Sequence, residues 1–271
     1  MKRVLVCLLA LMLADLPAFG GLFSETSAVA EAETAPPVLS GGRLEGEGFA
    51  SAEEAVTAYL QAMKENDVAG MLSTFAIETY VDNLDARAYL ARNGTFGSSS
   101  QAALAATDPY MRQIAVASRY ADLADGFWYQ YITAAWPEEY GEYESSRALL
   151  LSDDAAVEEF LSLMDAAEFS TFLQEMDLTG FVSPATFSEY YQIPGNMKVI
   201  ASMAEAYGCD ELADVVACVE SGGEEYYQFM YCARYGNLWY NLSLGGYAAN
   251  FLGVYDFFSG GLVPVSALAA E

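Results

Sequence analysis

The sequence contains no histidine among its 271 residues. This absence excludes histidine-based catalytic triads, histidine zinc sites and imidazole general bases. No glycine-rich phosphate loop precedes a lysine, and no serine stands in a G-x-S-x-G segment. The four cysteines form no C-x-x-C pair, which argues against a zinc site. We therefore predict no cofactor and no metal site.

Basic residues are also scarce. The chain has 11 lysines and arginines against 38 aspartates and glutamates, a formal net charge of −27. A field of that sign repels nucleic acid and anionic lipid, so we expect no nucleic-acid partner and no firm membrane partner. Acidic residues crowd positions 122–125 and 138–144, but neither group has the spacing of a calcium loop, and we interpret both as solvated charge.

The first apolar run, residues 4–13, is shorter than the roughly 20 residues of a transmembrane helix. Lys2 and Arg3 precede it, which is typical of a secretory signal peptide. Small residues at 28 and 30 favour cleavage after Ala30 over an earlier site at Gly20. We therefore predict a cleaved signal peptide at 1–30, a secreted, extracellular protein, and a flexible acidic leader at 31–48, rich in Glu, Gly and Pro.

Residues 50–76 have the pattern of a helical hairpin. Ser51 and Glu54 have the spacing of a capping box at a helix start, and Asn66-Asp67 offers a stop followed by a new N-cap. From residue 78 to about 203 the apolar period is mostly helical. Pro109 predicts a helix to about Asp122, Ser152 predicts a second, and residues 196–207 predict a third that ends at Gly208.

Beyond Gly208 the pattern changes to strands. Residues 213–219, 225–235 and 238–244 are β-branched, aromatic and alternating, and the glycine-containing pairs at 222–223 and 236–237 are hairpin signals. We predict a three-stranded antiparallel meander. The predicted organisation is a single α+β domain at 49–246, with a helical insertion at about 78–203, followed by an apolar C-terminal tail at 247–271 that packs on the domain.

The hairpin loops fix a predicted register. Tyr235 lies opposite Leu238, which pairs Tyr231 with Leu242 and Phe229 with Leu244, and the first loop pairs Asp214 with Tyr231. One face of the sheet is then almost entirely apolar: Tyr227, Phe229, Tyr231, Ala233, Tyr235, Leu238, Tyr240, Leu242 and Leu244. The other face is mixed and carries Cys232, Arg234 and Trp239.

Signal cleavage leaves three cysteines, so one internal bridge is the maximum. Cys218 belongs to the apolar face and Cys232 to the mixed face, and side chains on opposite faces cannot bring their sulfurs to bonding distance. A bridge between Cys209 and Cys218 is the preferred prediction, and three reduced thiols are the alternative.

The segments "SAEEAVTAYLQAMKENDVAGMLSTF" and "DVVACVESGGEEYYQFMYCARYGNLWYNLSLGG" resemble the nuclear transport factor 2-like superfamily, the cystatin-like cone fold. They are more closely similar to uncharacterised exported proteins of anaerobic Gram-positive gut bacteria. That group has no established activity, so no catalytic residues carry over. The resemblance implies an opening helical hairpin that closes on a C-terminal antiparallel sheet in a cone-like arrangement. The predicted helices at 78–203 differ from the compact cone fold, which would have more strand in this part of the chain.

Some cone-fold enzymes, those of the ketosteroid isomerase type, use a carboxylate base with tyrosine hydroxyl donors in an apolar cavity. The analogous hypothesis here is Asp214 as base, with Tyr231 or Tyr240 as donor. The alternative is that Asp214 points to solvent at the sheet edge. Candidate ligand-binding residues are those of the apolar face: Tyr227, Phe229, Tyr231, Tyr235 and Tyr240. The preferred interpretation of this face is core buried against the helices of residues 51–75, and a pocket is the alternative.

No reaction signature names a substrate. The sequence therefore predicts an exported, non-catalytic binding or interaction module, with a small apolar ligand or a cell-surface partner. The alternative is a cone-fold enzyme that uses a carboxylate base and tyrosine hydroxyls on a small apolar substrate.

Overall fold

The computed structural model describes residues 43–93, 109–135, 172–252 and 260–268. Helices α3 (Ala52–Lys64), α4 (Val68–Ser73), α5 (Glu78–Asn83) and α6 (Ala86–Asn93) come first, followed by the long helix α7 (Pro109–Ala135). Strand β1 (Asp177–Val182), the 3-10 turn η3 (Pro184–Thr186) and helix α10 (Pro194–Tyr207) lead into β2 (Glu211–Ser221), β3 (Glu224–Tyr235) and β4 (Leu238–Leu244). Helix α11 (Tyr247–Phe251), β5 (Leu262–Pro264) and α13 (Val265–Leu268) complete the described chain. The predicted α+β class is confirmed.

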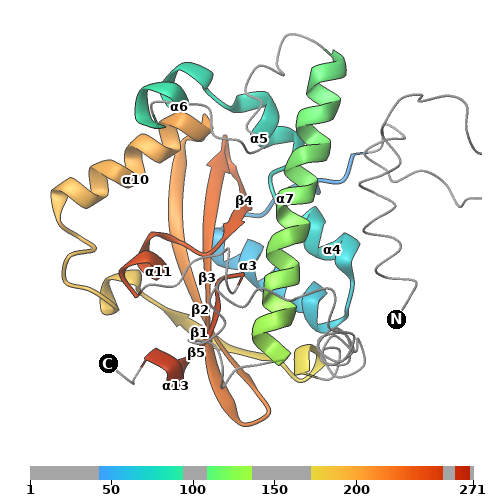
Figure 1. Ribbon diagram of the computed structural model, residues 1–271, viewed down its shortest axis with the longest axis vertical. Helices are drawn as coiled ribbons and strands as arrows, with labels where there is room; N and C mark the ends of the chain where they lie inside the picture. The colour runs from blue at the N-terminus through green and yellow to red at the C-terminus, as the bar shows by residue number, and fades with distance from the viewer. Residues whose placement is uncertain (1–42, 94–108, 136–171, 253–259, 269–271) are drawn as a thin grey trace, which may run out of the picture.

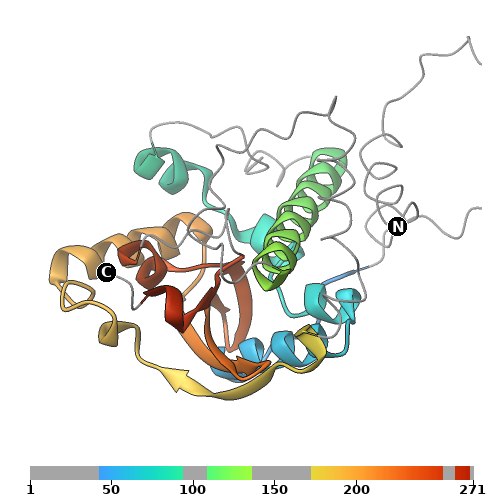
Figure 2. The ribbon, with the colours of Figure 1, turned by 60° about the horizontal axis from the view of Figure 1, so that its bottom comes forward.

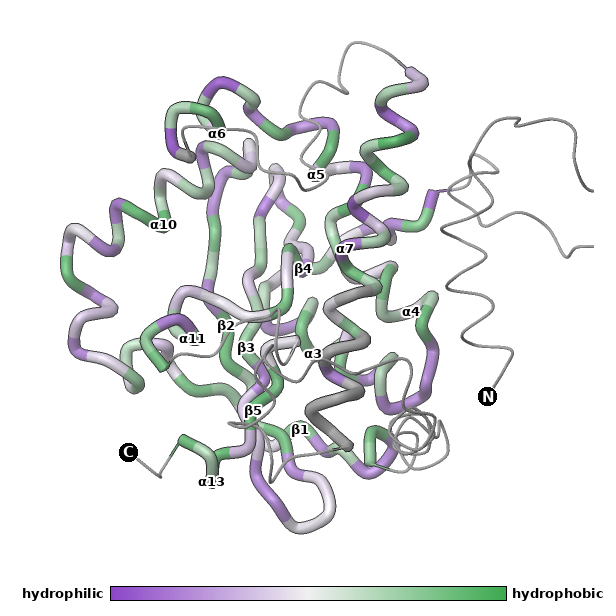
Figure 3. Tube along the Cα trace, viewed as in Figure 1, coloured by the Kyte–Doolittle hydropathy of each residue, from purple (hydrophilic) through white to green (hydrophobic). Residues whose placement is uncertain are grey.

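The sheet lies between two groups of helices (Figures 1 and 2). Helices α3, α4 and α7 lie on one side, and α10 lies on the other. Hydrophobic residues are concentrated on the central strands and on the helical turns that face them, whereas the end of the β2–β3 hairpin is hydrophilic or neutral (Figure 3). Among the described residues, no helix combines the length and apolarity that crossing a bilayer requires.

Capping determines where several helices begin and end. The Ser51 hydroxyl accepts from the Glu54 N–H at 3.1 Å, and the Glu54 carboxylate accepts from the Ala50 N–H at 3.1 Å. Asp67 caps α4 in the same way, which confirms the predicted hairpin. Pro109 opens α7, but the helix continues to Ala135, past the predicted end. Gly208, with φ of 64°, ends α10 as predicted. The helix expected after Ser152 lies outside the described residues.

Within the described residues the sheet has five strands, and not the predicted three. Strand order is β1-β2-β3-β4, and β5 pairs with β3 along the same edge as β4. Strand β1 lies inside the stretch predicted to be helical, and its six residues include Gly180 at a bulge. Strand β5 lies in the predicted C-terminal tail, and its residues Leu262 and Val263 are fully buried.

The predicted register holds for the first hairpin. Asp214 pairs with Tyr231 and Cys218 with Tyr227, as expected. In the second hairpin it holds from Tyr235 and Leu238 up to Cys232 and Asn241 and then shifts by one residue.

A β-bulge at Leu242 causes this shift, so that Tyr231 pairs with Ser243 and Met230 with Leu244. The predicted Tyr231–Leu242 and Phe229–Leu244 pairs are wrong. Leu244 therefore moves to the mixed face, where it packs closely against Gly126 of α7.

The mixed face, rather than the tyrosine-rich face, packs against α3. Asn241 is fully buried and donates to the Ala55 carbonyl and to the Thr74 hydroxyl, both at 2.9 Å. The Cys232 thiol contacts the Ala52 carbonyl at 3.8 Å. Hydrogen bonds to the helix backbone thus allow a partly polar face to be buried.

The predicted Cys209–Cys218 bridge does not form in this structure. All three described cysteines are free thiols. Cys209 precedes β2 and Cys218 lies near its far end, and an extended strand rises about 3.3 Å per residue. The two thiols therefore lie at opposite ends of one strand, far beyond bonding distance.

Candidate functional site

The Asp214 carboxylate is the centre of the candidate site. Asp214 lies on β2, largely buried, and points toward the start of α11 rather than to solvent. Its Oδ1 atom accepts from the Tyr247 N–H at 2.9 Å, and its Oδ2 atom accepts from the Ala248 N–H at 3.0 Å. The carboxylate therefore caps the N-terminus of α11, where free N–H groups favour an acceptor. The predicted alternative of a solvent-facing residue at the sheet edge is wrong.

Local sequence explains why α11 begins beside Asp214. Gly245 has φ of 82°, a conformation that glycine adopts readily. At the next residue, Gly246, a Cβ atom would collide with the Asp214 carboxylate. The Leu-Gly-Gly end of β4 thus lets the chain turn tightly over β2 and present two successive N–H groups to one carboxylate.

Burial and hydrogen bonding have opposite effects on Asp214. Burial raises its pKa from 3.8 to about 6, although hydrogen bonds from the Tyr191 hydroxyl and from the Ala248 and Tyr247 N–H groups lower it. Burial also raises the pKa of Tyr191 well above its ordinary value, and the neighbouring Asp214 charge adds to the rise. The site therefore holds a carboxyl that titrates near pH 6 beside a neutral phenol.

The two tyrosine hydroxyls predicted as partners of Asp214 contact other residues instead. Tyr231 lies opposite Asp214, but its hydroxyl contacts the Met203 sulfur of α10 at 3.9 Å. The Tyr240 hydroxyl donates to the Glu47 carbonyl at 3.2 Å. The hydroxyl that meets the carboxylate belongs to Tyr191, which lies between η3 and α10. Tyr191 stands in no motif, and only the tertiary fold brings it to Asp214.

The tyrosine-rich face is covered by residues 187–207. The Phe187 ring packs edge-on against Tyr227, with centroids 5.0 Å apart, and lies 5.4 Å from Phe229. The Tyr235 hydroxyl donates to the Tyr207 carbonyl at 3.2 Å. The covering elements are η3 and α10, and not the helices of residues 51–75 that the sequence suggested.

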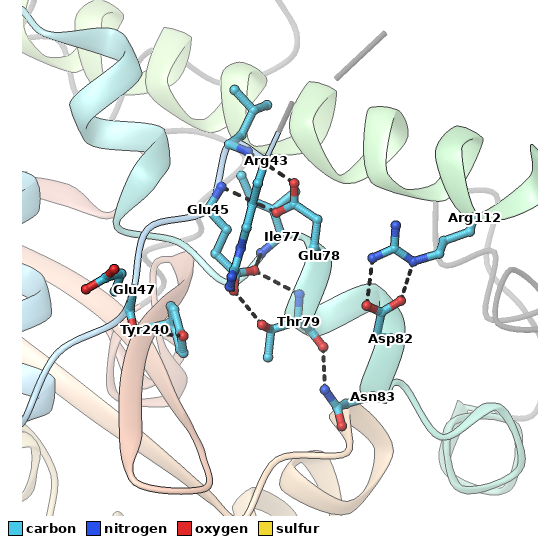
Figure 4. Close-up of polar contacts among 11 residues, drawn as sticks. Arg43, Glu45, Glu47, Ile77, Glu78, Thr79, Asp82, Asn83, Arg112 and Tyr240 are labelled. Carbon is cyan, nitrogen blue, oxygen red and sulfur yellow. Dashed lines mark hydrogen bonds and ion pairs between the residues drawn. The ribbon is translucent and has the colours of Figure 1, made fainter. Parts of the chain in front are cut away.

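Residues 43–49 form a strap across the start of α5 and the edge of β4 (Figure 4). The Glu45 side chain is fully buried and accepts from the N–H groups of Ile77 at 2.7 Å and Thr79 at 2.8 Å. It also accepts from the Thr79 hydroxyl and from Arg43. Glu78 in return accepts from the strap's own N–H groups at residues 44 and 45. The predicted leader therefore extends too far, because its last residues belong to the domain.

One concavity lies apart from Asp214, at the end of the β2–β3 hairpin, with a volume of about 610 Å³. Its lining residues are Glu220, Gly223, Glu224, Glu225, Val265 and Ser266. The Ser266 hydroxyl donates to Glu224 at 2.5 Å, so one of the carboxylates is already engaged. Within the described ranges, no group of three or more acidic or cysteine side chains is arranged to hold a metal ion.

No family model matches the chain, and no curated protein matches it. Among solved structures, the chain is similar to a cystatin-like protein from Ruminococcus gnavus ATCC 29149, with 11% sequence identity and a TM-score of 0.46. The match covers 83% of this chain and 43% of that chain, so this chain spans less than half of that protein's length.

Proposed function

We propose that the protein is an exported, non-catalytic interaction module that binds a cell-surface protein. The observation that carries the proposal is an exposed apolar surface at one end of the molecule, which we call the α10–α11 surface. It consists of Tyr190, Ile193 and Met197, exposed by 57%, 44% and 44%, and of Phe251, exposed by 38%. Phe251 lies beside Tyr191, the chain neighbour of Tyr190, with ring centroids 6.5 Å apart.

Large apolar side chains gathered at one place on a soluble surface are typical of an interaction site. The tyrosine-rich face is a weaker candidate for ligand binding, because its hydroxyls and rings contact α10 and Phe187. The net charge of −27 favours a partner whose contact surface has an apolar centre and a basic rim. Export, which brings the protein to such a partner, is supported by the N-terminal signal pattern.

The test compares two matched double variants of the secreted protein. Ile193→Ser with Met197→Ser removes the centre of the α10–α11 surface. Met111→Ser with Ile114→Ser removes the same residue types from α7, where they are exposed by 38% and 44%. We expect fluorescently labelled protein to bind intact cells of the producing organism in flow cytometry. The first variant should lose at least about tenfold in affinity, the order expected when two central apolar anchors are lost, and the second should bind like wild type.

Equal binding by wild type and the Ile193→Ser/Met197→Ser variant would exclude the α10–α11 surface as the binding site. Protease treatment of the cells should abolish binding, and binding that survives it would exclude a protein partner. Higher salt should also weaken binding, since the proposed rim contacts are ionic.

A second candidate function is the carboxylate-based enzyme, which is favoured by the Asp214 pKa of about 6. Two observations argue against this enzyme. Both Asp214 oxygens accept hydrogen bonds from backbone N–H groups, and the hydroxyls of the predicted donors Tyr231 and Tyr240 contact other residues. The Asp214→Asn variant separates the two functions. It should abolish any turnover of a small apolar substrate, which the Ile193→Ser/Met197→Ser variant should leave unchanged.

A further inference from the structure

Strand β1 lies at the outer edge of the sheet (Figure 2). Among the residues that the structure describes, its backbone pairs with β2 alone. The other edge of the sheet, at β4, is covered, because Trp239 pairs with Phe49 of the strap and Asn241 pairs with Phe75. The N–H and C=O groups on the outer side of β1 are therefore available to pair with a further extended chain.

Strand β1 is anchored in its extended conformation. At its bulge, the Thr179 hydroxyl donates to the Cys218 carbonyl of β2 at 3.1 Å, and regular pairing resumes on both sides. The strand contains no lysine and no proline, the residues with which proteins commonly block an exposed edge. Its short length and its bulge restrict pairing to a short segment and disfavour an open-ended stack of copies.

The charge beside this edge determines which segment fits it. Asp177 of β1 pairs with Glu220 of β2, which in turn pairs with Glu225 of β3. Three carboxylates thus stand directly opposite one another on the tyrosine-rich face, and like charges in this position repel. The Lys64 ammonium contacts Asp177, whose side chain remains 73% exposed. A lysine or arginine opposite Asp177 on an added strand would continue the row with a compensating charge.

The opposite face of the edge is apolar. Phe181 pairs with Ala217 and is 39% exposed. Ala217 precedes Cys218 on β2, so Phe181 lies on the mixed face, across the sheet from Asp177. A residue added beside Phe181 gains most from being apolar. A strand that alternates basic and apolar residues therefore matches both faces of β1.

We propose that β1 is a docking edge for an extended basic segment of another protein, which adds to the sheet as an antiparallel strand. Antiparallel addition continues the pairing of the existing strands. A second copy of this chain fits less well, because each copy carries a net charge of −27 and β1 itself has no basic residue to place opposite Asp177.

A capped peptide of sequence Lys-Val-Lys-Val-Lys-Val-Lys-Val tests the docking edge. Amide hydrogen exchange of the secreted chain is measured by NMR with and without the peptide at saturation. Exchange of amides within residues 177–182 should slow at least about tenfold. The Trp239 amide, which donates to the Phe49 carbonyl at the other edge, should not change.

A second peptide separates strand pairing from attraction between opposite charges. Lys-Lys-Lys-Lys-Val-Val-Val-Val has the same charge and composition but does not alternate. It should bind at least about fivefold more weakly and leave the exchange of β1 amides unchanged. Equal slowing by both peptides, or no slowing by the alternating one, would overturn the proposal.

Two charge reversals identify the edge from the protein side. Asp177→Lys should weaken binding of the alternating peptide at least about fivefold, because like charges then face each other. Glu205→Lys makes the same change in net charge at an exposed position on α10 and should stay within about twofold of wild type. An equal loss in both variants would assign binding to the overall charge and overturn the docking edge.

Two other occupants of the edge or the peptide are distinguished in the same way. Protection of β1 amides that rises with protein concentration, with no peptide present, would make a second copy the occupant and overturn the proposal. The Ile193→Ser/Met197→Ser variant should bind the alternating peptide like wild type, and a loss would place the peptide on the α10–α11 surface instead. The docking edge and the proposed function can therefore fail independently.

Discussion

Replacing Glu45 with alanine removes the acceptor that caps the start of α5. The Ile77 and Thr79 N–H groups and the Thr79 hydroxyl then lose their partner, and Arg43 loses its ion pair. A buried donor without an acceptor costs about 1–3 kcal/mol, and loss of a helix cap costs about 0.5–2 kcal/mol. The Thr79 groups are only partly buried and can recover water. We therefore expect the free energy of unfolding to fall by about 3 kcal/mol.

Urea denaturation of the secreted chain measures this loss as a lower midpoint with an unchanged slope. For a domain of this size, about 3 kcal/mol corresponds to a melting temperature lower by about 6–12 °C. Glu47→Ala is the matched control, because Glu47 lies in the same strap with its side chain exposed. The control should stay within about 0.5 kcal/mol of wild type.

Truncation gives an independent measurement of the same strap. A chain that starts at residue 43 should unfold like the secreted chain, whereas one that starts at residue 50 should lose at least as much stability as Glu45→Ala. The reasoning is refuted if Glu45→Ala and Glu47→Ala are equally stable, or if removing residues 43–49 has no effect.

Three further outcomes are expected. Arg119→Met removes a guanidinium that donates to the Leu242 carbonyl at the β-bulge, and should lower the free energy of unfolding in urea by about 1.5–3 kcal/mol; a loss below about 0.5 kcal/mol would refute this. Gly246→Ala should lower the free energy of unfolding by about 1–3 kcal/mol, and the melting temperature by several degrees, because the new methyl group collides with the Asp214 carboxylate. Gly195→Ala, where nothing lies within 4 Å, should leave it nearly unchanged, and equal shifts would contradict the packing argument. Mass spectrometry of the secreted protein should find Glu31 at the N-terminus, and a product that retains residues 1–30 would contradict export by a cleaved signal.

Local patterns in the sequence were sufficient to predict most of the elements. The Ser51 cap, the Gly208 helix end and the two hairpin loops depend on neighbouring residues alone, and all four appear in the structure. Strand β1 was missed because its six residues include a glycine and form a ladder only against the edge of β2.

In the part of the β3–β4 pairing beyond the bulge, the strand register depends on tertiary contacts. Arg119, on α7, donates to the carbonyl of the bulged residue Leu242 and to that of Ala76. A side chain more than a hundred residues away thus contacts the β4 backbone where the register shifts, and no pattern within the hairpin reports this.

The candidate site was predicted in part. Pairing of Asp214 with Tyr231 follows from hairpin arithmetic and is correct. The contact with Tyr191 and the capping of α11 could not be predicted, because both depend on how α10 and the Leu-Gly-Gly turn pack. Which face packs against α3 could not be predicted either, since Asn241 is a polar residue that is buried through hydrogen bonds to Ala55 and Thr74.

The central claim is that residues 187–207 close the tyrosine-rich face, which leaves the α10–α11 surface for partners. Hydroxyl-radical footprinting with mass spectrometry tests it directly, because the labelling rate of a tyrosine follows its solvent exposure. Tyr231 is 7% exposed and Tyr190 is 57% exposed, so Tyr190 should be labelled several times faster. Labelling of Tyr231 and Phe229 at the rate of Tyr190 in the folded protein would show an open face and contradict the account.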